Sequence, residues 1–444
     1  MTDKNTDDNG MELTIQDVGY RGRGVGRNSG QVVFVPGVIE GEKVRVRVTH
    51  RHKRFVDAEL VEVVEPSPMR VAPECPLALR ASKEEGAPGY PCVGCAYQHV
   101  AYEDEVRMKQ RQLESLLKRM ARLDDVPYAA PIRSPLALGY RNKIKLHGGT
   151  YKGQRVLGYV GANNHSVLDV TQCPLACEAI NVRLAELRGQ GDVTTESTER
   201  EDPASSRSAE LRRDKGKSWL ESLRRSAEVT LRWTEADGVC EAVRGVKRMK
   251  GELTERSVLG DLTVPAGGFY QINTAVADLL VEHVRGIISE SSCGHVLDLY
   301  CGVGVFGLAA AMEGKRAWGV DSDERSVQCA DRNAESLCAD GELHFEVAHV
   351  EQAVKEMLET SPMDDTLVVV DPPRLGLDRH VIAALTDSSP RELIYVSCAP
   401  DTLARDLVPL TGAGYRVKEV KLFDMFPRTA CFETVVVMEK GATA

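Results

Sequence analysis

The chain has 444 residues, 42% hydrophobic side chains and a formal net charge of −10, which suggests two to four globular domains with real cores. The first ten residues are polar and acidic, and no apolar run reaches the roughly 18 residues of a membrane span, so we expect neither a signal peptide nor a membrane protein. Twelve cysteines without an export signal favour reduced thiols, bound metal and a cytoplasmic location.

A disordered tail is expected over residues 1–10, followed by a small β-barrel over residues 11–67. Residues 43–48 alternate strictly between apolar and basic side chains, and glycine-rich turns separate several such short runs. Nine Lys and Arg residues lie between positions 21 and 54, against only two acids. This local basic charge favours a nucleic-acid contact, with an ordinary solvated face as the alternative.

A central domain is predicted over residues 68–260. It contains three cysteines and then a basic helix over 106–123, which carries six Lys and Arg residues and one acid. Residues 190–217 are polar and poor in bulky apolar side chains, so we expect a disordered insertion there.

The last domain is expected over residues 261–444, where strands alternate with helices. The predicted helices cover 273–288, 305–313, 324–339, 378–386 and 401–410. The predicted strands cover 296–299, 317–320, 367–370, 393–396, 415–423 and 432–438. This alternation predicts a parallel, doubly wound sheet with a ligand at the carboxyl ends of its strands.

A glycine loop follows the first of these strands. Gly302 and Gly304 allow a ligand to approach the backbone, and Asp321 ends the next strand, where a carboxylate binds ribose hydroxyls. The negative charge of Asp298 would repel a pyrophosphate group and would attract a cationic cofactor. S-adenosylmethionine (SAM) therefore fits this loop better than NAD, and an ordinary structural turn is the alternative.

A second loop, Asp371-Pro-Pro-Arg374, follows an apolar strand and holds a carboxylate at the strand end. The loop is similar to the Asp-Pro-Pro-aromatic motif of amino-group methyltransferases. Arg374 stands where that motif has its aromatic residue, which argues against methylation of an amino group. The pattern of RNA cytosine-5 methyltransferases has a second cysteine in this loop. This loop contains no cysteine, which argues against cytosine as the methylated base.

Cys398 ends an apolar strand and Pro400 follows, so the thiol is a candidate nucleophile. A thiolate that adds to C6 of a pyrimidine makes C5 nucleophilic, and a base must later remove the C5 proton. Glu433 enters an apolar strand, where burial raises a carboxyl pKa. A structural cysteine and an exposed strand-edge carboxylate are the alternatives.

Five motifs together resemble the RNA uracil-5 methyltransferase family, most closely its 23S rRNA branch. They are Phe269-Tyr-Gln-Ile-Asn273, Asp298-Leu-Tyr-Cys-Gly-Val-Gly304, Asp371-Pro-Pro-Arg374, Ser397-Cys-Ala-Pro-Asp-Thr-Leu-Ala-Arg-Asp406 and Asp424-Met-Phe-Pro-Arg-Thr429 through Glu433. The resemblance covers nearly all of the chain except its extreme N-terminus and the insertion.

The resemblance implies a fold, a reaction and its residues. The fold is α/β, with a Rossmann-like SAM-dependent methyltransferase domain, an OB-like TRAM barrel that binds RNA, and a small central iron–sulfur-bearing α+β domain. Cys398 is implied as the nucleophile and Glu433 as the base. The implied SAM contacts are Gln271, Tyr300, Asp321 and Asp371.

Four cysteines resemble the [4Fe–4S] motif of this family: Cys75, Cys92, Cys95 and Cys173. Four thiolates also suit zinc, and Cys177 is an alternative fourth ligand. The gap between the first two cysteines is longer than the family pattern. Because methyl transfer is redox-neutral, a structural or RNA-folding role is expected for the cluster.

Two positions depart from the family pattern: Val305 replaces an asparagine, and Cys431 replaces a histidine. These departures leave one alternative function open, an iron–sulfur RNA-binding protein with a degenerate methyltransferase domain. The other alternative is a cytosine-5 methyltransferase, which the missing second cysteine disfavours. The expected partner is RNA, with 23S rRNA favoured over tRNA and no membrane partner. The sequence does not indicate an oligomeric state.

Overall fold

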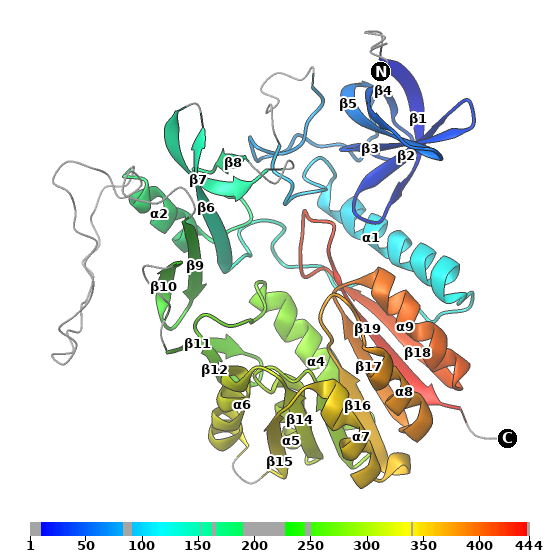
Figure 1. Cartoon of the computed structure of the whole chain (residues 1–444), viewed down its shortest axis with the longest axis vertical. Coiled ribbons are helices and arrows are strands. Elements are labelled where there is room, and N and C mark those ends of the chain that lie inside the picture. The colour runs from blue at the N-terminus through cyan, green and yellow to red at the C-terminus, as the bar shows by residue number, and fades with distance from the viewer. Residues whose placement is uncertain are drawn as a thin grey trace.

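The computed structural model describes residues 10–82, 91–151, 153–161, 166–189, 227–244, 249, 251–338 and 341–441. The predicted insertion over 190–217 and nearly all of the predicted tail lie outside these ranges. Three parts are visible in Figure 1: an N-terminal barrel, a smaller central sheet, and a large C-terminal sheet covered by helices. None of the helices described is long and apolar enough to span a membrane.

The expected N-terminal barrel is confirmed. Its strands are β1 (Met11–Gly19), β2 (Arg23–Asn28), β3 (Gln31–Pro36), β4 (Lys43–Arg51) and β5 (Phe55–Glu65). They close in the order β1-β2-β3-β5-β4. The alternating side chains of β4 explain the closure, because Val44 and Val46 enter a fully buried core while the basic residues that alternate with them point outward.

Part of the basic charge of the barrel is neutralised by acids on its other strands. Lys43, Arg45 and Arg47 of β4 lie directly opposite acids of β5, in the register pairs Lys43–Glu65, Arg45–Glu62 and Arg47–Glu59. All three cross-strand pairs form ion pairs. Four exposed cations form no ion pair with any described residue: Arg27, Arg51, Lys53 and Arg54.

The central part contains one long helix and a five-stranded sheet. The helix is α1 (Tyr102–Leu116), which continues as the π-helical turn η1 (Leu117–Ala121). The sheet has the order β10-β9-β6-β7-β8 and is followed by the hairpin β11-β12. The bounds are β6 (Lys143–Tyr151), β7 (Gln154–Val160), β8 (Val167–Asp169), α2 (Glu178–Leu187), β9 (Glu228–Thr234), β10 (Gly238–Val243), β11 (Glu252–Ser257) and β12 (Gly260–Pro265).

The basic helix predicted over 106–123 is present as α1 and η1, and each of the three cations of α1 is paired with an acid. Lys109 is fully buried and pairs with two acids, so it cannot reach a phosphate. Arg107 and Arg111 pair with Asp104 and Glu40. The apolar side of the same helix, with Leu113, joins the core of the C-terminal domain.

The C-terminal sheet has the order β15-β14-β13-β16-β17-β19-β18. Its elements are α4 (Thr274–Glu290), β13 (His295–Leu299), α5 (Val305–Met312), β14 (Arg316–Asp321), α6 (Glu324–Leu337), β15 (Leu343–Val347), α7 (Val350–Thr360), η2 (Met363–Asp365), β16 (Thr366–Val370), α8 (Arg379–Ser388), β17 (Glu392–Ser397), α9 (Pro400–Gly412), β18 (Tyr415–Phe423) and β19 (Glu433–Lys440). Helices cover both faces of this sheet (Figure 1).

Two predictions for this domain need correction. The sheet is not wholly parallel, because β19 runs antiparallel to both of its neighbours, β17 and β18. The sequence patterns also missed β15 and α7, since β15 is short and only one of its residues, Phe345, is buried. The proposed domain boundaries stay a prediction, and the hairpin β11-β12 spans the one at residue 260.

Candidate active site

Strand direction brings four titratable side chains to one edge of the large sheet. Asp321 is the last residue of β14, while Asp371 and Cys398 directly follow β16 and β17. Glu433 is the first residue of β19, and the antiparallel direction of β19 places that first residue at the same edge. In the register, Ser397 lies opposite Thr434, so Cys398 and Glu433 extend the same pair of neighbouring strands.

A tight turn presents Cys398 at this edge. The strand ends at Ser397, and α9 begins at Pro400, where a proline fixes the helical backbone without wasting an N–H group. The Ser397 hydroxyl accepts the Ala399 N–H at 3.2 Å, which closes the turn. Cys398 is half-buried, unlike residues 393–397 of the strand before it, which are buried.

The acids around Cys398 hold its proton in place. Burial, followed by Glu433 and Asp371, raises the pKa of the Cys398 thiol to about 12, while the Arg374 guanidinium lowers it. Burial also raises the pKa of Glu433 well above its ordinary value, and Asp371 adds to this shift. A carboxylate with a raised pKa is a stronger base, as proton removal from carbon requires.

Arg374 connects two thiols of the site. Its guanidinium donates to Cys431 Sγ at 3.4 Å and also contacts Cys398. The sequence pattern around Arg374 argues against amino methylation but does not predict this contact. Because the cation favours the ionised form of Cys398, Arg374 is a further candidate residue of the site.

The barrel also reaches this site, which sequence reasoning missed. Tyr20, in the turn between β1 and β2, packs edge-on against Phe432, with ring centroids 6.1 Å apart. The next residue, Arg21, pairs with Asp401 at 3.3 Å, three positions after the candidate nucleophile. No local pattern predicts such a contact, because it depends on how two domains dock.

The glycine loop after β13 has the backbone of a ligand-binding turn. Gly302 and Gly304 have φ values of +55° and +87°, and Tyr300 has φ +67°, which is unusual for a side chain with a Cβ. A Cβ on Gly304 would lie 2.5 Å from the Phe345 ring, so only glycine fits there. A Cβ on Gly302 would meet nothing within 4 Å, so this turn faces open space.

Three carboxyl groups give this loop a negative field. Asp298 is fully buried; its Oδ2 accepts the Gly307 N–H at 2.8 Å, and its Oδ1 has no hydrogen-bond partner. Burial, with a smaller contribution from the nearby Asp321, raises the pKa values of Asp298 and Asp371 to about 7. A cationic ligand relieves this repulsion, so the residues present fit the SAM predicted from the sequence.

The two other expected cofactor contacts lie in nearby segments. Tyr300 begins the glycine loop, and burial, with several surrounding acids, raises the pKa of its hydroxyl. Gln271 is half-buried between β12 and α4, where its backbone carbonyl accepts a hydrogen bond from the Asn142 side chain. Asn273 ties the same segment to Met425 through a 3.2 Å hydrogen bond. Among the described residues, no hydrogen bond links the Gln271 side chain to the strand-end acids.

The four predicted cluster cysteines share one neighbourhood. After burial, mutual repulsion between the thiols is among the causes that raise the pKa values of Cys75, Cys92 and Cys95, and Cys173 contributes to all three. The pKa of Cys177 is raised by burial, with no contribution from these thiols. Within the described part of the chain, no group of three or more His, Cys, Asp or Glu side chains is arranged to hold a single metal ion.

Comparison with known proteins places this geometry in a class. The tRNA (Uracil-5-)-methyltransferase family model matches residues 260–441, and the TRAM domain model matches residues 10–61. The fold is that of a SAM-dependent methyltransferase, because it matches the crystal structure of Pyrococcus abyssi tRNA (uracil-54, C5)-methyltransferase in complex with S-adenosyl-L-homocysteine. The TM-score is 0.67 at 24% identity, over 96% of this chain and 100% of that one.

The sequence relatives define the family more closely. The chain is 30% identical to an RNA methyltransferase of Thermosynechococcus vestitus, over 96% of this chain and 97% of the relative. It is 28% identical to one of Listeria innocua with the same coverage. The chain belongs to the RNA uracil-5 methyltransferase family and is a SAM-dependent RNA methyltransferase.

Proposed function

We propose that this protein methylates C5 of uracil in structured RNA, with 23S rRNA as the substrate, through a covalent bond between Cys398 and C6. The observation that carries this proposal is the register of β17 and β19. In this register the Cys398 thiol and the buried Glu433 carboxyl group extend neighbouring strands at the sheet edge where Asp321 and Asp371 also lie. Asp371 and the glycine loop lie at the same edge.

The proposed reaction begins with the thiol. Cys398 Sγ, favoured as the thiolate by Arg374, adds to C6 of uracil, and the displaced electron pair makes C5 nucleophilic. C5 then bonds to the methyl group that SAM, when bound, would supply, and the bond between that methyl group and the sulfonium sulfur breaks, so that S-adenosyl-L-homocysteine leaves. Asp371 would be among the residues that face the positive charge of the cofactor. This charge favours the ionised forms of the neighbouring acids.

Glu433 completes the reaction. Its carboxylate removes the C5 proton, the electron pair returns to the ring, and the bond between C6 and Cys398 breaks to release the thiolate. Burial excludes water from Glu433 and raises its pKa, so the proton passes to this group rather than to solvent. Gln271, Tyr300, Asp321 and Asp371 are proposed to hold SAM.

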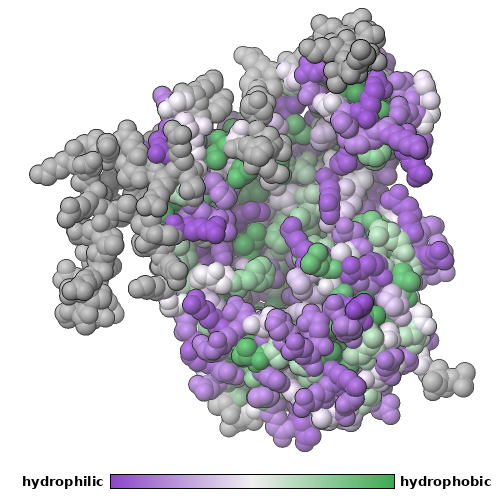
Figure 2. Space-filling view, in the orientation of Figure 1, coloured by the Kyte–Doolittle hydropathy of each residue, from purple (hydrophilic) through white to green (hydrophobic). Residues whose placement is uncertain are grey.

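The RNA is proposed to contact the barrel and the open face beneath it. Arg51, Lys53 and Arg54, which form no ion pair with any described residue, neighbour in sequence the stacked rings of His52 and Phe55, whose centroids are 4.1 Å apart. Rings and cations of this kind bind single-stranded bases and phosphates. The face in Figure 2 is hollowed below the barrel, with several apolar residues in the hollow and hydrophilic residues around it.

A target uracil must leave its stack to reach Cys398, because C6 is not accessible inside a helix. Two exposed apolar side chains flank the proposed site residues in sequence: Phe269 is 74% exposed and Leu375 is 80% exposed. Such side chains suit contact with an unstacked base. We propose a loop or bulge uridine as the target and the cytoplasm as the location.

The choice between RNA classes has a direct test. Purified protein with SAM is incubated with 23S rRNA or with a tRNA pool that lacks 5-methyluridine, and nucleosides are measured by mass spectrometry. We expect 5-methyluridine in the rRNA and none in the tRNA. Methylation of the tRNA alone would reject the rRNA assignment and leave the uracil assignment standing.

We propose that Cys75, Cys92, Cys95 and Cys173 hold a [4Fe–4S] cluster with a structural role. The four thiols supply the donor set of such a cluster. After burial, repulsion among these thiols raises the pKa values of Cys75, Cys92 and Cys95, which supports a shared site.

The cluster assignment predicts the metal content. Protein purified anaerobically should contain about four irons per chain and absorb visible light. Cys173→Ser should lose this iron, whereas Cys177→Ser, the matched control four residues away, should keep it. Stoichiometric zinc with negligible iron would reject the proposal.

A further inference from the structure

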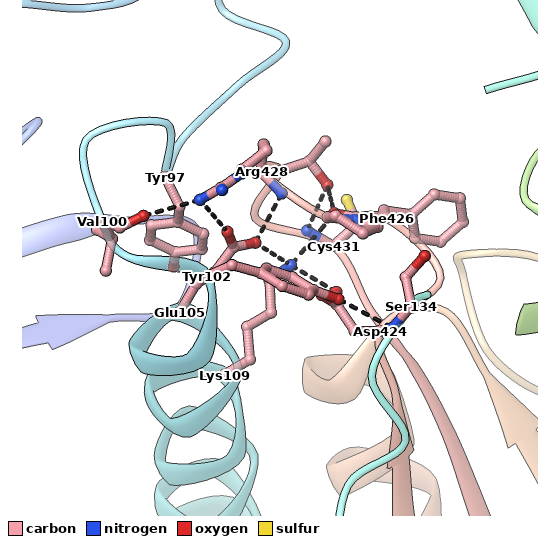
Figure 3. A network of polar contacts seen from close by, with 12 residues as sticks. Tyr97, Val100, Tyr102, Glu105, Lys109, Ser134, Asp424, Phe426, Arg428 and Cys431 are labelled. Atoms are coloured by element: carbon pink, nitrogen blue, oxygen red, sulfur yellow. Dashed lines mark hydrogen bonds and ion pairs between the residues drawn. The ribbon is translucent and has the colours of Figure 1, made fainter. Parts of the chain in front are cut away.

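Three buried charged side chains and the partly buried Arg428 form one network between α1 and the segment that joins β18 to β19 (Figure 3). Lys109 Nζ lies 2.7 Å from Glu105 Oε1 and 2.7 Å from Asp424 Oδ1. Arg428 Nη1 lies 3.4 Å from Glu105 Oε2. Two cations therefore face two acids. Burial opposes the charge of Lys109, but Asp424 and Glu105 outweigh it and raise the pKa of Lys109, so the ammonium group stays charged.

The network also holds the backbone of the joining segment, residues 424–432, which we call the base loop because Glu433 directly follows it. Lys109 Nζ donates to the Phe426 carbonyl at 3.2 Å. Glu105 accepts the Arg428 backbone N–H at 2.7 Å, and the Arg428 guanidinium donates to the Val100 carbonyl at 2.7 Å. Helix α1 thus holds the base loop at two peptide units.

The backbone of the base loop is strained at the point where it is held. Arg428 has φ +66°, a left-handed conformation that side chains with a Cβ adopt rarely and at a cost in free energy. Such a conformation persists only where surrounding contacts determine it. The Glu105 carboxylate binds both the N–H and the guanidinium of Arg428, so it fixes this conformation directly.

Arg428 is also held by the segment of residues 92–97, which we call the cysteine loop. The backbone N–H groups of Ala96 and Tyr97 both donate to the Arg428 carbonyl, at 2.9 Å and 3.0 Å. These two residues directly follow Cys95, one of the proposed cluster ligands. Arg428 is therefore held by α1 through its N–H and side chain and by the cysteine loop through its carbonyl.

Buried ion pairs of this kind are a poor source of stability, because apolar side chains of similar volume stabilise a core as well or better. Their presence here is better explained by the precise geometry that they impose on the segments they join. We propose that Glu105, Lys109 and Arg428 are positioning residues that hold the base loop, and thereby Glu433, in place for proton removal. The cysteine loop is the second half of this clamp. The inference rests on the proposed function of Glu433.

The first test separates the two halves of the reaction. Lys109→Met removes the central cation, and Arg107→Met is the matched control, because Arg107 is an exposed cation of α1 paired with Asp104. We measure covalent RNA–protein complex in the first turnover and product release in the steady state. Lys109→Met should form the complex within about threefold of the wild-type rate and release product about 10- to 100-fold more slowly, the cost of a small misplacement.

A purely structural role of Lys109 gives a different result. It would lower complex formation and release equally, and that result, or release at the wild-type rate, would overturn the inference. If Lys109→Met does not fold, Lys109→Met with Asp424→Asn takes its place, since the pair Glu105–Arg428 then remains balanced. The same split between formation and release is expected of this double variant.

The second test examines the cysteine half without using activity. Backbone hydrogen exchange of residues 424–432 is compared between anaerobic wild-type protein, Cys95→Ser and the control Cys177→Ser. We expect faster exchange in this segment only for Cys95→Ser. Unchanged exchange in a folded Cys95→Ser protein would overturn the coupling. Failure of the proposed function would appear separately, as wild-type protein that forms no covalent complex at all.

Discussion

RNA that carries 5-fluorouridine at the target position should become covalently attached to the wild-type protein and not to Cys398→Ala. Fluorine cannot leave C5 as a proton, so the reaction stops after methyl transfer with C6 still bonded to sulfur. Attachment is detected as a band of raised mass that survives denaturing electrophoresis. We expect complete loss of this band in Cys398→Ala, because no other group replaces the bond to sulfur.

The rate of attachment should rise with pH. The pKa of Cys398 is raised to about 12, so near neutral pH each unit of pH increases the reactive thiolate about tenfold. Cys338→Ala is the matched control, because Cys338 follows the C-terminal end of α6, away from the strand ends that form the site. A covalent adduct in Cys398→Ala would remove Cys398 from the mechanism.

Glu433→Gln should methylate its RNA once and then stall with the RNA still bound to Cys398. The substitution preserves the shape of the side chain and removes only its capacity to take the C5 proton. Loss of a general base costs about 10²- to 10⁴-fold, and the loss should fall on release rather than on the first methyl transfer. Rapid-quench measurements of both steps separate them.

The control for this variant lies on the same strand. Glu439 is at the other end of β19, where it pairs with Lys418 on the surface, so Glu439→Gln should turn over normally. Normal multiple turnover by Glu433→Gln would show that another group removes the proton. Cys431, held by Arg374 in the same site, would then be the first residue to examine.

Much of the fold was predictable because its signals are local. The apolar run of β16, Thr366–Val370, is buried along its whole length, as expected of a central parallel strand. The direction of β19 was not predictable in this way. A strand pattern carries no sign of its direction, and here direction decides whether Glu433 meets Cys398 or lies at the opposite edge of the sheet.

The charge of the chain shows the same difference between local and non-local signals. Nine basic residues in one sequence window predicted a basic barrel face, but acids of β5 lie opposite three of them once the strands pair. Lys109 read as part of a basic helix, yet its partner Asp424 is 315 positions away. The contacts of Tyr20 and Arg374 likewise join segments that only the tertiary fold brings together.

In the proposed reaction a methyl group replaces the hydrogen on C5 of uracil. Target RNA is transcribed with [5-³H]uridine and incubated with the protein and SAM that carries a ¹⁴C-labelled methyl group. We expect one tritium released to water for each methyl group gained, and no release from RNA labelled only with [5-³H]cytidine. Methyl incorporation with the uridine tritium retained, or tritium released from cytidine instead, would contradict it.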